Sequence, residues 1–495
     1  MNMLALLGIF TFVIVFLLRR FFDPKKRILS QIPGPRGIPF LGNALQIDPI
    51  NIHKDLLSWK ETYGDIFKLD FAGDQVVVLN SHAAIHEALV TKSKEFAGRV
   101  ADSFRNEYME AHRGIVFRDF DNEFANVKRV IHSAVKMYDD NSEKVIHRIN
   151  AEIQCCMDKF NVYNERPFDP KKDIYTTLIN IMAELLASHR FEDDDPKLND
   201  IIEYQHAVSE ALSAGVGDEL DMFPWLRYFG NQTFKKMQFF LKMRNQIIGE
   251  WVEEHKKSFN RDDIRDLTEA LLKAREDGDA TFSDHVIILL VDDMLGAGII
   301  TTQVVVSAYL QLMILHPEVQ TRLQHEVDSV VGTSRAPSIE DRDAMPVLQA
   351  NIHEILRYVS HVPIAVPHKT TVDTSVGGYD IPKSTQVWIN LFALHHDEKI
   401  FDEPWSYKPE RWLDDSGQLV SIEERNKIFP FGAGRRVCAA EQFARTRMFL
   451  FLSNILQRFT IVQPEDAEPP SADPRNYTLG IILEPGPFTI KAIPR

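Results

Sequence analysis

The stretch FPFGAGRRVC, residues 429–438, combines residue types that could do chemistry together. It holds two glycines, two adjacent arginines and, at its end, Cys438, in a chain with three cysteines. Glycines let a backbone approach another molecule closely, and arginines bind anions. A cysteine beside fixed positive charge tends to be a thiolate, which acts as a nucleophile or as a metal ligand.

Common loop chemistries do not match this stretch. A phosphate-binding loop needs a lysine and a Ser/Thr after its second glycine, and a dinucleotide fingerprint needs a third glycine. A phosphatase-like loop would have its arginine soon after the cysteine, whereas AAEQFA follows Cys438. A haem fits better, because its iron takes an axial thiolate and its propionates need cations such as Arg436. For a lone cysteine the alternative is an inert buried thiol.

A second group of residues predicts a structural brace. Glu354 and Arg357, in EILR, share one face of a helix expected between Met345 and Val359. Alone, such a pair is usually a surface ion pair. Arg411, in YKPERW, follows a proline-bound loop and could share the same carboxylate. The loop would then be tied to the helix.

A long apolar stretch, residues 283–317, predicts a helix that crosses the interior. Ser283 is its expected N-cap and Pro317 its stop. Gly296 and Gly298 lie in the middle, where each costs about 1 kcal/mol relative to alanine. They indicate either close helix–helix packing or a flat molecule lying against the backbone.

Two threonines follow these glycines. Mid-helix threonines commonly bond back to the preceding turn. If a flat cofactor lies over Gly298, the hydroxyl of Thr301 would point into the space beyond it, with Thr302 next to it.

The rest of the body predicts a mainly α fold with a small β-rich part. Residues 65–81 contain two β-rich runs separated by Gly73 and Asp74, which predicts a hairpin. Residues 375–394 are also strand-like. Most of the remaining body has the pattern of helices.

The N-terminal residues 1–22 predict a membrane anchor. Residues 3–18 are uncharged and apolar, and the basic residues come after them. A cleaved signal peptide would have its positive charge first and a small-residue cleavage site after the apolar run. By the positive-inside rule the body faces the cytosol. Residues 23–43, basic and proline-rich, predict a stiff hinge.

Composition narrows the class of protein. The formal charge of −15 argues against nucleic acid as a partner. Cys155 and Cys156 are adjacent and far from Cys438, so neither a disulfide framework nor a zinc pattern is indicated. A chain of 495 residues has either two or three domains or one large core.

In combination these residues resemble the cytochrome P450 family over nearly the whole chain. FPFGAGRRVCAAEQFA is similar to the family's haem loop, F-G-x-G-x-R-x-C-x-G-x-x-x-A. EILR with PERW is similar to its Glu-x-x-Arg and Arg triad. The anchor and the PGP hinge resemble the microsomal type, and residues 366–401 resemble the steroid 17-alpha-hydroxylase branch.

The resemblance implies a cytochrome P450 fold, with one catalytic domain over residues 44–495. It implies heme b as cofactor, with Cys438 as the axial iron ligand and Thr301 as a catalytic residue. The triad is Glu354, Arg357 and Arg411. The other implied cofactor-binding residues are Arg436, His368, Lys128, Phe431, Gly434 and Gly298.

Three positions depart from the family pattern. Ala440 stands where a glycine is usual. Phe124 stands where a tryptophan usually donates its ring N–H to a propionate, although Lys128 remains as a cationic neighbour. Ile300 replaces the usual acidic residue before Thr301, and this puts the ordinary route of oxygen activation in question.

The implied activity is insertion of one oxygen atom from dioxygen into an apolar substrate, such as a steroid or related lipid. The sequence resembles no flavin or nicotinamide site, so electrons would come from NADPH-cytochrome reductase, with cytochrome b5 as a second donor. The expected place is the endoplasmic reticulum membrane, as a single-pass protein. A basic face for an acidic reductase is expected from Lys128, Arg129, Arg435, Arg445 and Arg447.

Two alternatives remain open at the level of the sequence. One is a haem-thiolate isomerase or dehydratase acting on a lipid peroxide, which Ile300 favours, while Thr301 and the basic face count against it. The other is a non-catalytic membrane haem-binding protein.

Overall fold

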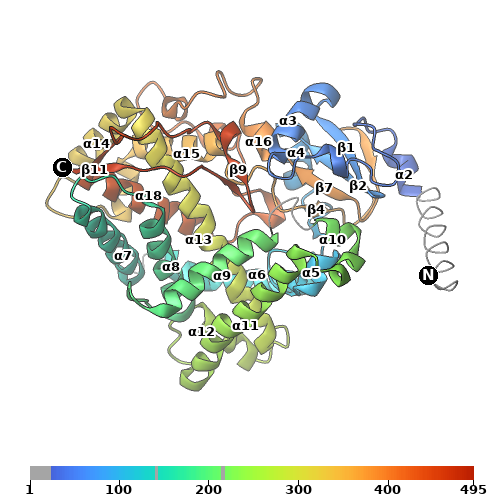
Figure 1. Cartoon of the computed structure of the whole chain (residues 1–495), viewed down its shortest axis with the longest axis horizontal. Coiled ribbons are helices and arrows are strands. Elements are labelled where there is room, and N and C mark those ends of the chain that lie inside the picture. The colour runs from blue at the N-terminus through green and yellow to red at the C-terminus, as the bar shows by residue number, and fades with distance from the viewer. Residues whose placement is uncertain (1–23, 140–142, 213–217) are drawn as a thin grey trace.

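The computed structural model describes residues 24–139, 143–212 and 218–495, so the predicted anchor lies outside the described residues. The described chain is mainly helical, as predicted (Figure 1). The long helices are α3 (Ile52–Tyr63), α6 (Asn122–Asp139), α7 (Glu143–Val162), α8 (Lys171–Ala187), α9 (Pro196–Leu212), α11 (Gln232–Ser258), α12 (Leu267–Glu276), α13 (Asp284–Leu315), α14 (Pro317–Val330), α15 (Pro346–Val359) and α18 (Glu441–Arg458). The short ones are α2 (Pro24–Leu29), α4 (His82–His86), α5 (Phe104–Tyr108), α10 (Asp218–Met222), α16 (Leu391–His395) and α17 (Ile422–Arg425).

The β-rich part is organised around a five-stranded sheet with the order β1-β2-β7-β4-β3. The predicted hairpin is confirmed, because β1 and β2 pair antiparallel with Phe71 opposite Asp74. Its turn is formed by Ala72 and Gly73, both with positive φ. The sheet strands are β1 (Ile66–Phe71), β2 (Asp74–Leu79), β3 (Gly98–Arg99), β4 (His368–Lys369) and β7 (Gln386–Ile389). Three two-stranded sheets are formed by β5 (Thr374–Val376) with β6 (Tyr379–Ile381), β8 (Phe459–Val462) with β11 (Lys491–Pro494), and β9 (Thr478–Leu479) with β10 (Leu483–Glu484).

Helix α13 is the interior helix that the sequence predicted. The hydroxyl of Ser283 accepts a hydrogen bond from Val286 N at 3.3 Å, which caps the first turn. The helix ends at Leu315, and Pro317 is the first residue of α14. Helices α8, α11, α15 and α18 pack around it, and Figure 1 shows it near the centre of the molecule. Among the described helices it alone is long and apolar enough to cross a membrane, but 78% of its apolar window is buried, as in a core helix.

The predicted hinge packs onto the sheet from residue 24 onward. Leu29, at the end of α2, and Ile32 after it are 1% and 2% exposed and pack with the apolar side chains of the sheet. The Lys68 N–H of β1 donates to the Pro33 carbonyl oxygen at 2.8 Å. These contacts make the segment part of the folded body.

Candidate functional site

The loop that carries Cys438 is held in shape by its glycines. Gly432 and Gly434 have positive φ angles of 71° and 65°, which residues with side chains rarely adopt. A Cβ on Gly434 would also overlap the carbonyl oxygen of Leu89. The loop closes where Cys438 N–H donates to the Phe431 carbonyl oxygen at 2.9 Å. Gly434 and Phe431 therefore shape the turn that directs the Cys438 side chain.

Cys438 lies deep in the protein and still keeps accessible surface. It is exposed, and yet burial raises the pKa of its thiol, while the charges of Arg447 and Lys128 act to lower that pKa. From these two properties we infer that Cys438 borders a hollow in the protein rather than its open outer surface. Ala297 is also exposed, although most of α13 is buried. The guanidinium of Arg447, on the helix after Cys438, donates to the Gly298 carbonyl oxygen at 2.9 Å, so the loop and this turn of α13 adjoin.

Basic side chains gather beside the loop. Arg436 Nε donates to the Ala97 carbonyl oxygen at 2.6 Å and its Nη2 to that of Arg118 at 2.7 Å. Its Nη1 is buried and has no partner among the described residues. Burial and the neighbouring Arg436 charge hold the pKa of Arg99 well below its usual value, and burial and the Arg99 charge do the same to His368. The cluster is therefore crowded with desolvated donors.

No carboxylate among the described residues forms an ion pair with Arg99 or Arg436. Asp119 and Asp121 are the carboxylates whose charges act on Arg436, and Asp121 is exposed to screening by water. Buried cations without anionic partners are costly. A ligand that brings two carboxylates, as a haem does with its propionates, would supply the missing charge. The residues present therefore fit a haem beside Cys438.

Phe124 and Lys128 support the same region. Cζ of Arg436 lies 3.8 Å from the centroid of the Phe124 ring, which makes a cation–π contact. Phe124 thus lacks the N–H donor of a tryptophan but holds the arginine in place. Lys128 Nζ donates to the carbonyl oxygens of Arg435 at 2.9 Å and Val437 at 3.3 Å. An ammonium has three donors, so one remains for a ligand.

Arg99 belongs to this cluster, although no sequence motif indicated it. Strand β3 pairs with β4 so that Arg99 lies opposite His368, and its Nη1 donates to the Val366 carbonyl oxygen at 3.0 Å. The local signal was a single arginine in the apolar stretch FAGRV. A pairing between strands this far apart in sequence leaves no local motif.

The packing of Gly298 on α13 contradicts the expectation that a flat cofactor lies over it. Met182 of α8 fills the side-chain direction of Gly298, because a Cβ there would lie 2.5 Å from its Sδ. Gly298 therefore serves helix packing, the alternative that the sequence left open, and Ala297 borders the hollow instead.

Thr301 Oγ1 donates to the Ala297 carbonyl oxygen at 2.8 Å, and Thr301 stays partly exposed. Ile300 is buried, and it provides no acid there.

The structure brings Glu354, Arg357 and Arg411 together in the interior. Arg357 donates to both carboxylate oxygens of Glu354 at 2.8 Å, and Arg411 Nε donates to Oε1 at 3.1 Å. Trp412 Nε1 adds a bond to Oε2 at 2.9 Å, and Lys408 N a bond to Oε1 at 2.9 Å. Glu354 and Arg357 are fully buried, so this network is no surface pair. It fastens α15 to the segment around residues 408–412.

The expected basic face is smaller than the sequence indicated. Arg447 is 2% exposed, which removes it from the surface. Arg445 is ion-paired with Glu441 at 2.9 Å and lies over the Phe431 ring at 4.7 Å. Arg435 remains exposed at the loop.

We expect Glu354→Ala to give little folded, cofactor-loaded protein. Removing one partner from a buried charge network costs about 3–5 kcal/mol, because the other charges stay buried and unpaired. The matched control is Glu410→Ala, which breaks an exposed pair with Arg322 (2.9 Å) worth about 0–1 kcal/mol. Thermal unfolding and absorbance of the bound cofactor measure both. Equal stability of the two variants would contradict the bracing role.

Comparison with known proteins identifies the family. The family described as Cytochrome P450 matches residues 32–492. The chain is 32% identical to "Steroid 17-alpha-hydroxylase/17,20 lyase" of Peromyscus leucopus, over 98% of this chain and 96% of the relative. It is also 32% identical to the protein of that name from Gallus gallus, over 94% of each chain. It is 33% identical to "Cytochrome P450 2D3" of Rattus norvegicus, over 99% of this chain and 98% of the relative. The resemblance seen in the sequence is confirmed, and the chain belongs to the cytochrome P450 family of monooxygenases.

Proposed function

We propose that this protein is a haem-thiolate monooxygenase that inserts one oxygen atom from dioxygen into an apolar substrate, with electrons from a separate reductase. The observation that carries the proposal is Cys438, a desolvated residue with free surface at an internal hollow beside α13. Cys438 would hold the iron of heme b, and Arg436, Arg99 and His368 would bind its propionates. The bound haem supplies the oxygen chemistry. The chain's own residues bind the haem, orient the substrate and deliver protons.

Cleavage of dioxygen requires a proton donor near Thr301, and the side chain of Ile300 cannot act as one. Asp292 and Asp293 lie N-terminal to Ile300 on α13, and both already accept hydrogen bonds. Asp292 accepts a hydrogen bond from Tyr204, and Asp293 Oδ2 accepts from Ile115 N at 2.6 Å and from Val116 N at 3.1 Å. We infer that water bound to the Thr301 hydroxyl carries the protons.

The substrate class follows from the lining and from the relatives. Segments 362–366 and 478–483, the proposed lining of the substrate pocket, are largely apolar, and Val366 and Ile481 keep free surface. Relatives named for steroid hydroxylation favour a steroid or related lipid.

The electron donor would dock near the Cys438 loop. Arg435 is exposed there, and Arg129 lies on the same helix as Lys128. An acidic reductase surface would complement them. NADPH-cytochrome reductase is the proposed donor, with cytochrome b5 as a second.

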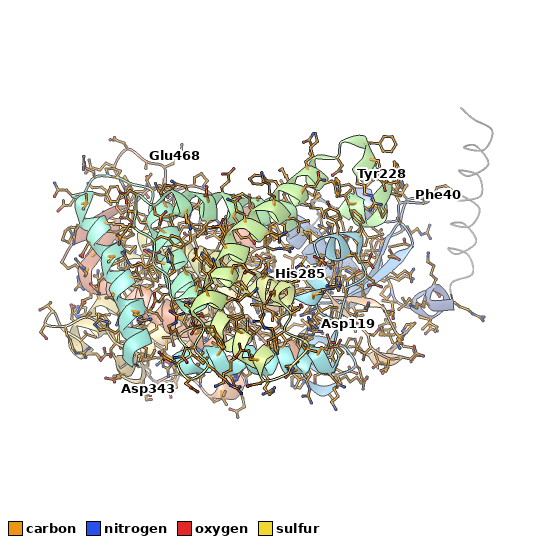
Figure 2. The ribbon with its side chains drawn as sticks, turned by 90° about the horizontal axis from the view of Figure 1, so that it is seen from below. Phe40, Asp119, Tyr228, His285, Asp343 and Glu468 are labelled. Carbon is orange, nitrogen blue, oxygen red and sulfur yellow. The ribbon has the colours of Figure 1, made fainter. Side chains whose placement is uncertain are left out.

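The proposed location is the endoplasmic reticulum membrane, with anchor 1–22 and the catalytic domain in the cytosol. The described residues add an aromatic patch, which we define as Phe40, Trp225, Tyr228 and Phe229. Their exposed fractions are 53%, 50%, 73% and 78%. Figure 2 shows Phe40 and Tyr228 at the same end of the molecule. Exposed aromatic groups of this kind favour the membrane interface.

A second function, rearrangement of a lipid peroxide without a reductase, rests on Ile300. It requires no proton delivery for cleavage of dioxygen. The partly exposed Thr301 beside the hollow favours the monooxygenase.

The ligand assignment predicts that Cys438→Ala abolishes both activity and the thiolate signature in the reduced carbon monoxide difference spectrum. Cys155→Ala and Cys156→Ala are the controls, and both should keep the parent spectrum, because these cysteines lie on α7. An unchanged spectrum in Cys438→Ala would contradict the assignment of Cys438 as the iron ligand.

The water route predicts that Thr301→Ala consumes NADPH with little product, because the hydroxyl that orders the water is gone. Thr302→Ala is the matched control, since its neighbouring hydroxyl is buried. Ile300→Glu should raise the yield of product per NADPH if the hollow admits the charge. The measurement is NADPH consumed per product formed, with and without added hydroperoxide. Efficient reductase-driven turnover by Thr301→Ala, or turnover by peroxide alone, contradicts this route.

The membrane proposal predicts that protein lacking residues 1–22 keeps its haem and still sediments weakly with phospholipid vesicles. Changing Trp225 and Phe229 to serine together should abolish the residual binding. Val162→Ser, at an apolar position 75% exposed on α7, is the control and should not change it. Full-length protein that stays soluble without detergent would count against the anchor.

A further inference from the structure

Arg447 is a buried cation in the middle of the protein. It lies on α18, the helix that follows the Cys438 loop, and it is 2% exposed. Its Nη1 donates to the Gly298 carbonyl oxygen at 2.9 Å and lies 3.3 Å from Met182 Sδ. Its Cζ is 4.5 Å from the centroid of the Phe443 ring. All of these contacts are to neutral groups.

The guanidinium has no anionic partner of the ordinary kind. Among the described residues no carboxylate forms an ion pair with Arg447, and its Nε is buried without a hydrogen-bond partner. Burial lowers the pKa of Arg447 to about 10, so it remains protonated at neutral pH. The negative group whose charge acts on it is Cys438. A buried guanidinium with no carboxylate is costly unless another anion offsets it.

We propose that Arg447 compensates the negative charge of the Cys438 thiolate and thereby raises the reduction potential of the iron that this thiolate binds. The proposal rests on Cys438 being the iron ligand. In that reduction, one electron from the reductase would convert ferric to ferrous iron, with no bond formed or broken. A fixed positive charge nearby favours the product, because the site becomes more negative by one charge. Arg447 acts through Cys438 and is therefore a positioning residue.

The same side chain also joins α18 to α13. Its bond to Gly298 lies next to Ala297, whose carbonyl oxygen accepts the hydrogen bond from Thr301. Arg447 therefore links the helix behind the thiolate to the turn that holds the catalytic threonine. A neutral residue at this position could retain packing there but could not retain the charge. Charge and packing can thus be separated by experiment.

The test is spectroelectrochemical titration of the substrate-free, haem-loaded protein. Arg447→Gln should shift the one-electron equilibrium roughly tenfold toward the ferric state, which corresponds to about 59 mV. Arg447→Lys keeps the charge and should stay close to the parent. Arg458→Gln is the matched control, because it makes the same charge change at the far end of α18, in a pair with Asp158. It should leave the potential unchanged.

Several results would overturn the proposal. One is a potential in Arg447→Gln equal to that of Arg458→Gln, and another is an equal shift in Arg447→Lys and Arg447→Gln. If Arg447→Gln does not load haem, Arg447→Lys decides alone, and its failure to load haem also overturns the proposal, since charge would then not be sufficient. The carbon monoxide spectrum of the parent tests Cys438 separately. The thiolate signature in that spectrum does not depend on the shifts in reduction potential of the Arg447 variants.

Discussion

The Cys438 site contains buried guanidinium groups that form no ion pair with a carboxylate among the described residues, and the site is organised around these cations. Arg99 and Arg436 lie at one side of the Cys438 loop beside His368, whose lowered pKa keeps it neutral, and Arg447 lies behind the loop. Their desolvation is tolerable when a thiolate and a carboxylate-bearing cofactor are present. Binding of the cofactor and completion of the fold are therefore thermodynamically linked, since a ligand that binds the native state stabilises it.

The buried charges of the Glu354 network, unlike those beside Cys438, are paired with one another. Its carboxylate is satisfied entirely by the chain, through Arg357, Arg411 and Trp412, and requires no ligand. It is complete without the cofactor, and it fixes α15 against the segment around residues 408–412. The protein thus has one charged cluster complete in itself and another that a ligand completes. The first supports the scaffold, and the second selects what binds to it.

Local patterns in the sequence predicted those features that depend on neighbouring residues. The hairpin, the limits of α13 and the fold class follow from alternation, caps and apolar runs, and the Cys438 loop from its compact motif. The contact of Gly298 with Met182, the opposition of Arg99 and His368 and the burial of Arg447 depend on segments distant in sequence. The residue type alone does not say whether a glycine or an arginine faces a helix, a ligand or water. These three features could therefore be found only in the structure.

The docking of α2 onto the sheet has a practical consequence for preparing the protein. Leu29 and Ile32 cover apolar side chains of the sheet, among them Ile66 and Val77. A chain shortened up to residue 23 keeps this cover. A chain shortened beyond Ile32 uncovers a β surface with an apolar face, the kind of surface through which proteins aggregate. The choice of first residue therefore governs solubility independently of any membrane segment.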